Sequence, residues 1–539
     1  MLVRSILSVF ILFIVINSTF AGSFFLKTDP SCPHEDSILK NTLVLKKYHQ
    51  IMGLYLVDET SPVIREWIQA KQKPRCVKYI EANGEIKLEW DTVHKSNPWN
   101  DPLHPELWYL INSNDHVSIH AEEAWNIIFE SPDQIVAVVD SGIDYTHPDL
   151  FQNIWINAGE SGTDTHGIDK RSNGIDDDNN GFVDDYIGWN FIDNNNNPAD
   201  DFGHGTHCAG SIGSTANNYI GIMGITHKVK MMPLKFIGST GTGLLDGAVS
   251  AILYAADNGA KIISNSWGHE SEFQSLADVI SYANSKEVLI VAAAGNSGKN
   301  LDSPYYQFYP AGYSHPNVIS VAAYDEKGNK ASFSNYGELL VDLAAPGMHI
   351  LSTIPNLKYG YKNGTSMATP IVSGALALML ELLPDLSIHQ IKERLIKSCD
   401  KELNLSDKVA SKGRLNLYNA LTGVYPKPDW PQSDDDWPLI TYELSTDHPT
   451  LGTFDKRWTI HMESAKYLRI LFDKIDLENI YDLIYLYDKN GSQIELIKGK
   501  TTMKNYFSKI IKGDTVTIRF RSQWGTTRYG FDIIRIGVY

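Results

Sequence analysis

Three short segments, far apart in the chain, supply a carboxylate, an imidazole and a hydroxyl. Asp140 ends the apolar run 135–139, His204 lies in the sequence Gly-His-Gly-Thr-His, and Ser366 lies in Gly-Thr-Ser-Met-Ala-Thr-Pro. A serine hydroxyl attacks a carbonyl carbon only when a neighbouring base takes its proton, and an acid that orients this base completes the unit. The residue types therefore predict hydrolysis by an acid, a base and a nucleophile in the chain order Asp, His, Ser.

Each of the three residues has a competing interpretation. His207 lies three residues after His204, which places it near His204 on a helix, so either imidazole is a candidate base. Asp144 lies four residues beyond Asp140 and is the alternative acid. Ser366 alone would also suit the N-cap of a helix, which is a structural role.

A fourth motif lies between the histidine and serine segments. It is Ala-Ala-Ala-Gly-Asn-Ser at 292–297, and it contains Asn296. The four motifs, in this order, resemble those of the subtilisin-like serine proteases, and the resemblance runs from about residue 100 to about residue 422. It implies that Asp140 is the acid, His204 the base and Ser366 the nucleophile, and that the side-chain amide of Asn296 stabilises the developing oxyanion.

The resemblance implies a serine endopeptidase that cuts protein or peptide substrates through an acyl-enzyme intermediate. A catalytically silent binding protein on the same scaffold is the alternative, but the triad and Asn296 are all present. An esterase of the α/β-hydrolase type is excluded, because the chain order differs and Ser366 does not lie in a Gly-x-Ser-x-Gly sequence.

Two further segments predict where an extended substrate binds. One contains Ser266, Trp267 and Gly268, and the other is a glycine-rich stretch that includes Gly241 and Gly243. Backbone hydrogen bonds hold a peptide that adds as a strand, and glycine lets it approach closely. The side chain of Trp267 either walls a pocket for a substrate side chain or fills the protein core.

An acidic loop between Asp140 and His204 predicts a structural calcium ion. Asp176, Asp178 and Asn180 occupy the first, third and fifth positions of a calcium loop, and a glycine is the sixth. The twelfth position holds an isoleucine where an EF-hand has glutamate, so Asp184 or Asp185 is expected to supply the missing carboxylate. The alternative is a solvated acidic turn without a metal.

Composition and the N-terminus place the protein outside the cytoplasm. The chain has 539 residues, 43% of them hydrophobic, and a net charge of −17, which argues against nucleic-acid binding. Residues 1–21 resemble a secretory signal, with Arg4, an apolar run at 6–16 and small residues before a cut after Ala21. No later run is long and apolar enough to predict a stable membrane span. We therefore expect a secreted, extracellular protein.

Residues 22–97 form a separate unit in the sequence. Runs at 54–57, 76–80 and 86–90 are typical of strands, the last two around an Asn-Gly turn, and 61–71 is typical of a helix. In subtilisin-like proteases a small α+β propeptide occupies this place, assists folding and inhibits the active site until it is cut. A permanent N-terminal domain is the alternative.

Four cysteines, Cys32, Cys76, Cys208 and Cys399, permit three full pairings, and the sequence does not choose among them. Cys32 and Cys76 share the N-terminal segment, so a disulfide between them is one candidate in an oxidising compartment. Cys208 follows the histidine motif directly and is expected to be a buried thiol.

The catalytic region, 98–423, predicts an α/β fold. Short apolar runs alternate with helical patterns, which is typical of a parallel sheet buried on both faces. The predicted strands are 134–139, 230–236, 261–264, 288–292 and 318–322, and the predicted helices are 243–258, 273–285 and 366–382. Active groups gather at the carboxyl ends of strands in such sheets, and Asp140 and Asn296 both follow such ends.

The C-terminal part has a different character. Residues 424–438 read as a linker, and 439–539 contain aromatic and β-branched runs at 467–472, 483–487, 515–520 and 531–536. This pattern predicts an antiparallel β-sandwich. It resembles a CUB domain without the usual cysteines, with a generic jelly-roll module as the alternative, and we expect it to bind a surface, glycan or protein ligand.

Overall fold

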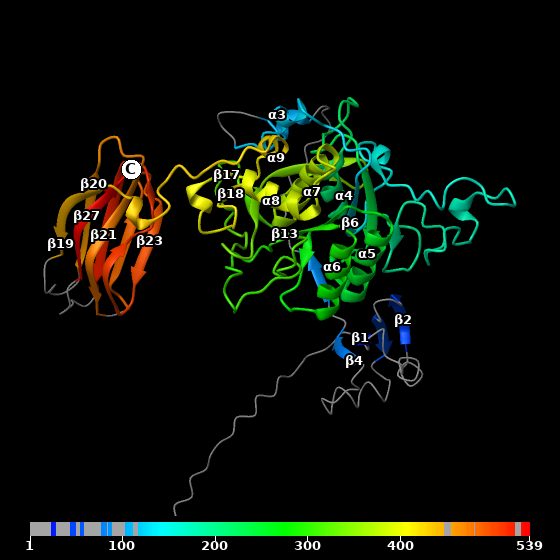
Figure 1. Ribbon diagram of the computed structural model, residues 1–539, viewed down its shortest axis with the longest axis horizontal. Coiled ribbons are helices and arrows are strands. Elements are labelled where there is room, and N and C mark those ends of the chain that lie inside the picture. The colour runs from blue at the N-terminus through cyan, green and yellow to red at the C-terminus, as the bar shows by residue number, and fades with distance from the viewer. Residues whose placement is uncertain are drawn as a thin grey trace, which may run out of the picture. The chain divides into compact units, whose positions relative to one another are not determined.

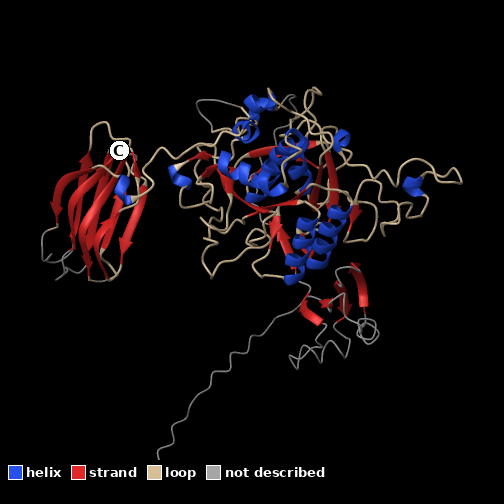
Figure 2. Cartoon of the chain, viewed as in Figure 1, coloured by secondary structure: helices blue, strands red, loops and turns tan. Residues whose placement is uncertain are grey.

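The computed structural model describes residues 23–28, 44–49, 54–58, 77–82, 85–88, 103–111, 117–446, 454–478, 480–522 and 530–539 (Figures 1 and 2). They fall into two compact units. The first unit contains the described residues up to 400 and residues 407–425, and the second contains residues 401–406 and the described residues from 426 onward. The predicted signal segment, the predicted helix 61–71, Cys32 and Cys76 lie outside the described residues.

A nine-stranded sheet forms the centre of the first unit, in the order β17-β18-β14-β13-β12-β10-β6-β8-β7. Neighbouring strands pair in parallel from β7 to β18. Its strands are β6 (Ile135–Asp140), β7 (Trp189–Asn190), β8 (Lys230–Lys235), β10 (Ile262–Asn265), β12 (Leu289–Ala293), β13 (Val318–Tyr324), β14 (Leu343–Pro346), β17 (Asp400–Lys401) and β18 (Gly413–Arg414). A separate hairpin joins β15 (Ile350–Ile354) and β16 (Lys358–Lys362).

Helices cover both faces of this sheet, as Figures 1 and 2 show. On one face α7 packs against β10, β12, β13 and β14, and α4 packs against α7 and β6; on the other, α5 packs against β6, β8 and α6. The α-helices are α3 (Ala121–Trp125), α4 (Gly205–Gly213), α5 (Leu245–Asp257), α6 (Gln274–Ser285), α7 (Thr365–Leu382), α8 (Ile388–Ser398) and α9 (Leu417–Thr422). Short 3-10 helices lie at His104–Glu106, Phe151–Asn153, Lys170–Ser172, Leu403–Leu405 and Asp434–Asp436.

The predicted parallel α/β fold is confirmed. All five predicted strands and all three predicted helices of the catalytic region are present, with ends that differ by at most two residues. The core strands are apolar because both of their faces are covered: every residue of β10, β12 and β13 is buried. Apolar burial on this scale supplies most of the driving force for folding.

Helix α7 is the one described helix that is long and apolar enough to cross a bilayer, and 83% of its most apolar window is buried inside the protein. Its burial is that of a core helix. This central position fixes the start of α7, where Ser366 lies.

The N-terminal strands form two different sheets. β1 (Ser23–Thr28), β2 (Val44–His49), β3 (Leu54–Asp58) and β4 (Val77–Ala82) make one sheet in the order β2-β3-β1-β4. β5 (Glu85–Leu88) instead pairs with β9 (Thr242–Leu244) and β11 (Trp267–Gly268) of the catalytic region. The Asn-Gly signal at 83–84 therefore separates strands of two sheets, because the strand after it has stronger partners elsewhere.

The second unit contains two antiparallel sheets around one apolar core, as an antiparallel sandwich requires. One has the order β19-β27-β21-β24 with β25 beside β21, and the other the order β20-β26-β22-β23. The strands are β19 (Leu439–Ser445), β20 (Phe454–His461), β21 (Tyr467–Leu477), β22 (Leu483–Tyr487), β23 (Gln493–Lys498), β24 (Thr501–Phe507), β25 (Ile511–Lys512), β26 (Thr515–Ser522) and β27 (Gly530–Val538). This architecture suits a CUB-like domain and a jelly roll equally, so that choice and the ligand of the unit stay predictions.

Candidate active site

Asp140 and His204 meet between the end of β6 and the start of α4. The imidazole Nδ1 lies 2.8 Å from Asp140 Oδ1 and 3.0 Å from Oδ2. Both side chains are buried, with exposed fractions of 1% for Asp140 and 0% for His204. A carboxylate at Nδ1 fixes the tautomer in which Nε2 is the basic atom, and it stabilises the imidazolium once a proton arrives.

The competing residues have other partners. His207 Nε2 lies 3.0 Å from the Ile350 carbonyl and 3.1 Å from the Gly360 carbonyl, so this nitrogen carries the proton and donates to the β15–β16 hairpin. Burial, with a smaller contribution from Lys362, lowers the pKa of His207 well below its ordinary value. Asp144 caps a turn by accepting from Thr146 and Asn356. His207 and Asp144 therefore have structural roles.

Asp200 holds the acid and base segments together, and our reading of the sequence missed it. Its Oδ1 accepts from the Ser141 hydroxyl at 2.8 Å and from the Gly203 amide at 2.7 Å, while Oδ2 accepts from the Thr206 amide at 2.9 Å. The Ser141 hydroxyl in turn accepts from the amide of Gly205 at 2.9 Å. The residues on either side of His204 are thus tied to the residue after Asp140.

Ser366 lies in the first turn of α7. Its hydroxyl donates to the Ser266 carbonyl at 2.9 Å, and the Ser266 hydroxyl donates to the Ser366 carbonyl at 2.9 Å. Cys208 joins this segment to the histidine, because its Sγ lies 3.9 Å from His204 Nδ1 and 3.5 Å from the Ser366 carbonyl oxygen. The first turn of α7, which carries Ser366, therefore lies close to the Asp140–His204 pair.

The thiol of Cys208 is free and buried, as the sequence predicts. Cys399 is also buried, and its thiol donates to the Leu395 carbonyl at 3.4 Å. Burial, followed by the charge of Asp140, raises the pKa of Cys208 well above the ordinary thiol value. The surroundings of Cys208 therefore disfavour the thiolate, which is the nucleophilic form of a thiol.

Asn296 follows the strand β12 and faces the start of α7. Its Oδ1 accepts from the backbone amide and the hydroxyl of Thr365, each at 2.9 Å. These two bonds fix which way the amide points. The amide nitrogen Nδ2 is buried and has no hydrogen-bond partner within the described part of the chain. A buried donor without a partner beside a serine nucleophile is suited to an oxyanion.

Comparison with known proteins agrees with this geometry. The sequence profile of the subtilase family matches residues 131–418. The chain belongs to the subtilase family. It is 32% identical over 397 residues to the thermophilic serine proteinase of Bacillus sp. (strain AK1), covering 69% of this chain and 88% of that protein. It is 36% identical over 303 residues to thermitase of Thermoactinomyces vulgaris, covering 56% and 93%.

A third relative is the cell wall-associated protease of Bacillus subtilis (strain 168), 32% identical over 408 residues, which cover 74% of this chain and 39% of that protein. This family and these relatives make the chain a serine-type endopeptidase.

The two predicted substrate segments of this subtilase flank one strand of its own N-terminal region. In the sheet β11-β5-β9, Lys87 pairs with Gly268 and Leu88 with Trp267, while Ile86 pairs with Gly243 on the other side. All these pairings are antiparallel. The two segments therefore hold an extended strand between them, which is the geometry that accepts an extended peptide.

The side chains of these two segments have different surroundings. The indole of Trp267 is fully buried, packs against Phe236 and donates to the Val139 carbonyl at 2.8 Å, so it fills the core and does not wall a pocket. Gly241 adopts φ +78° in a turn closed by a 2.9 Å bond from its amide to the Gly238 carbonyl. Trp267 contributes its backbone to the substrate segment.

The acidic loop brings together a different set of carboxylates from the predicted one. Oxygen atoms of Glu160, Asp178 and Asp185 lie within 4.8 Å of one another. Asn157 and Asn180 each donate from Nδ2 to Asp178 and to Asp185, at 2.8–3.2 Å. Glu160 precedes the loop by sixteen residues, and no local pattern in the sequence marked it.

Asp176 and Asp184 are not part of this cluster. The carboxylate of Asp176 accepts from the amides of Asn180 and Gly181, at 3.1 and 2.8 Å. The carboxylate of Asp184 accepts from the amide of Gly174, at 3.0 and 3.2 Å. Both residues hold loop amides in the structure, and their assignment as calcium ligands stays a prediction.

The cluster suits a hard cation. Burial, with a smaller contribution from neighbouring carboxylates, raises the pKa of both Glu160 and Asp185. Glu160 Oε2 is buried and has no hydrogen-bond partner among the described residues. An all-oxygen set whose atoms lie within 4.8 Å of one another matches Ca²⁺, which binds oxygen at about 2.3–2.6 Å.

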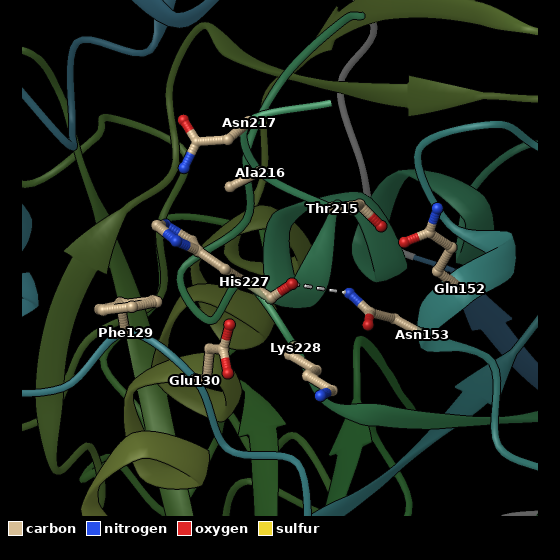
Figure 3. Close-up of a pocket in the computed structure, with 9 residues that line it drawn as sticks. All are labelled: Phe129, Glu130, Gln152, Asn153, Thr215, Ala216, Asn217, His227 and Lys228. Carbon is tan, nitrogen blue, oxygen red and sulfur yellow. Dashed lines mark hydrogen bonds between the residues drawn. The ribbon is translucent and has the colours of Figure 1, made fainter. Parts of the chain in front are cut away.

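A separate cavity of about 310 Å³ lies beside Phe129, Asn153, Thr215 and His227 (Figure 3). Asn153 donates to the His227 carbonyl at 3.2 Å, and burial lowers the pKa of His227 to about 4. None of its nine lining residues belongs to the triad or to the substrate segments. This cavity is therefore separate from the candidate site.

Proposed function

We propose that this subtilase hydrolyses internal peptide bonds through an acyl-enzyme, with Asp140, His204 and Ser366 as its triad. The observation that carries the proposal is the buried Asp140–His204 pair at 2.8 Å, joined through Cys208 to the first turn of α7. Catalytic hydrogen bonds are often incomplete before substrate binds, so the serine hydroxyl turns from the Ser266 carbonyl to His204 as the reaction begins.

Each residue then has one task. His204 accepts the Ser366 proton at Nε2 while the serine oxygen attacks the carbonyl carbon, and Asp140 stabilises the imidazolium. Asn296 Nδ2 donates to the oxyanion. The imidazolium gives its proton to the leaving amine. A water molecule then attacks the acyl group with His204 as its base, and Ser366 leaves with the proton that His204 returns to it.

Incubation with a quenched fluorescent decapeptide tests this function. Protein produced from the full-length chain is expected to cut the peptide at internal bonds, identified by product masses, and phenylmethylsulfonyl fluoride is expected to abolish the cleavage. Release of single terminal residues only, or full activity after the inhibitor has reacted, would contradict the proposal.

We also propose that the N-terminal segment inhibits the site before it is removed. The support is the strand β5, which fills the position between β9 and β11 that a substrate strand would take. Because a tethered strand binds intramolecularly, it competes at a high effective concentration until the chain that links it to the catalytic region is cut.

Secretion is the third part of the proposal. Its support is the charged and apolar start of the chain, together with the relative in Bacillus subtilis that is named for its association with the cell wall. An extracellular protease made with an inhibitory N-terminal segment is harmless to the cell that makes it.

Finally, we propose that Glu160, Asp178 and Asp185 hold a structural Ca²⁺ ion. The ion supplies a positive charge that offsets these three carboxylates, of which Glu160 and Asp185 are buried. Asn157 and Asn180 orient Asp178 and Asp185. A ligand that binds only the folded state stabilises it, by about 2.7 kcal/mol at a hundredfold excess over its dissociation constant.

Chelation with EDTA is expected to lower the melting temperature of the protein by at least about 5 °C, and excess Ca²⁺ to restore it. Glu160→Gln is expected to abolish this response, because it removes one of the three charges. Asp184→Asn is the matched control: it removes a charge from the same loop but outside the cluster, and its response should equal that of the wild type. An unchanged melting temperature on chelation of the wild type would exclude the ion.

A further inference from the structure

The register of the substrate segments locates the residue whose carbonyl is attacked. In the sheet that β5 completes, Gly268 and Trp267 pair with successive residues of the incoming strand. The next position is Ser266, whose carbonyl oxygen lies 2.9 Å from the Ser366 hydroxyl. A substrate residue opposite Ser266 therefore brings its carbonyl carbon to the nucleophile, and its carbonyl oxygen towards the free amide of Asn296.

The side chain of that substrate residue is attached to the Cα atom next to the reacting carbonyl carbon. It must enter between two backbone segments that converge on Ser366. One segment is 266–268, which carries the pairing groups, and the other is 294–296, which ends in the oxyanion donor Asn296. Each segment contains a glycine, which is Gly268 in the first and Gly295 in the second.

The ring of Phe308 lies against both glycines. A Cβ atom added to Gly268 would lie 2.4 Å from Phe308 Cε1, and a Cβ atom added to Gly295 would lie 3.0 Å from the same atom. Because glycine has no Cβ atom, both positions leave room for the Phe308 ring. Phe308 is only 5% exposed, so the ring occupies the space between the two segments and does not lie on the surface.

The backbone holds Phe308 in this place. The next residue, Tyr309, exchanges two hydrogen bonds with His269, at 2.9 and 2.8 Å. His269 directly follows Gly268, and the Phe308 carbonyl accepts from the amide of Gly312 at 2.7 Å. The backbone that carries the ring is thus anchored beside β11, the strand that is expected to pair with substrate.

We propose that Phe308 determines specificity by shortening the pocket for the substrate side chain that precedes the cut bond. The remaining space accepts Gly, Ala or Ser and rejects Leu, Phe and Tyr. This inference rests on the proposed hydrolysis at Ser366 and adds a substrate class to it: peptides with a small residue before the cut. Placing an extra ring in a packed protein interior costs free energy, so the exclusion of large substrate side chains is steric.

Succinyl-Ala-Ala-Pro-X p-nitroanilides with X as Ala, Leu or Phe measure this selectivity. For the wild type we expect kcat/KM for X as Ala to exceed that for X as Phe by at least about tenfold, the order that pocket size alone gives. A wild type that cuts after Phe as fast as after Ala would overturn the inference while leaving the proposed hydrolysis intact. Failure to cut any of the three, together with failure to cut the decapeptide, would instead count against the proposed function.

Phe308→Gly is expected to raise kcat/KM for X as Phe by about a hundredfold and to change the value for X as Ala by less than about threefold. Phe308→Leu, a smaller change to the fold, should shift the same ratio in the same direction. Phe182→Ala is the matched control, because it removes a ring packed on the apolar core at Trp189 and Tyr254, and should change all three substrates by one common factor. An unchanged Ala-to-Phe ratio in both Phe308 variants would show that the ring only fills the core.

Discussion

Replacing the Ser366 hydroxyl by hydrogen, in Ser366→Ala, is expected to lower kcat by about 10⁴-fold or more, with KM nearly unchanged. The size follows from removal of the nucleophile in Ser-His-Asp triads, for which subtilisin itself is one of the measured cases. The residual rate comes from binding and from the oxyanion donor, which the variant keeps. The measurement is the rate of decapeptide hydrolysis by the purified variant.

The same variant tests maturation. If the chain removes its own N-terminal segment, Ser366→Ala protein keeps that segment, and N-terminal sequencing finds a start upstream of β5. Ser373→Ala is the matched control, because it removes a buried hydroxyl from the same helix, where it bonds to Ser264 at 3.0 Å and has no role in the reaction. A Ser366→Ala chain trimmed at the wild-type position would refute self-processing, and one with wild-type turnover would refute the assigned nucleophile.

The second large effect is expected for Asn296→Ala. Loss of a single oxyanion donor lowers kcat by about 10²- to 10³-fold, a range measured at the corresponding donor of subtilisin, with little change in KM. The structural reason is the buried Nδ2, which has no partner within the described part of the chain. We expect kcat to fall in this range and the melting temperature to change by only a few degrees.

Asn296 also anchors Thr365, so a structural effect must be separated from a chemical one. Thr365→Val breaks the hydroxyl bond to Asn296 Oδ1 but leaves the Nδ2 donor in place. We expect it to lower kcat less than about tenfold, since the two neutral hydrogen bonds that it removes, to Asn296 Oδ1 and from the Gly295 amide, are worth about 1 kcal/mol each and neither is made to the oxyanion. Equal losses in the two variants would mean that Asn296 holds the helix start and does not bind the oxyanion.

Local patterns in the sequence were sufficient to predict the sheet and the triad segments. The strand ending at Asp140 is apolar because both faces of β6 are buried, and the Gly-rich histidine and serine motifs begin helices that must approach closely. Each of these motifs consists of a few consecutive residues, so it can be recognised in the sequence alone. The choice of His204 over His207 came from the resemblance, and it stays a prediction that the contacts of His207 with the β15–β16 hairpin favour.

Contacts between distant segments were not predictable in this way. Glu160 joins Asp178 and Asp185 only through the folding of the loop, and Asp200 reaches the Asp140 segment only because α4 starts beside it. Phe308 is one of nineteen phenylalanines in the sequence, and only its position against Gly268 and Gly295 distinguishes it. The placement of β5 between β9 and β11 likewise depends on pairing across more than 150 residues, which no periodicity encodes.

Covalent labelling with diisopropyl fluorophosphate tests the central claim, that Asp140, His204 and Ser366 act as one nucleophilic unit. After digestion of the labelled wild type, mass spectrometry should find one phosphorylated peptide, modified at Ser366. The Ser366→Ala variant should remain unlabelled, and His204→Ala should label far more slowly because the hydroxyl has lost its base. Labelling at another serine, or an equal labelling rate in His204→Ala, would contradict the account.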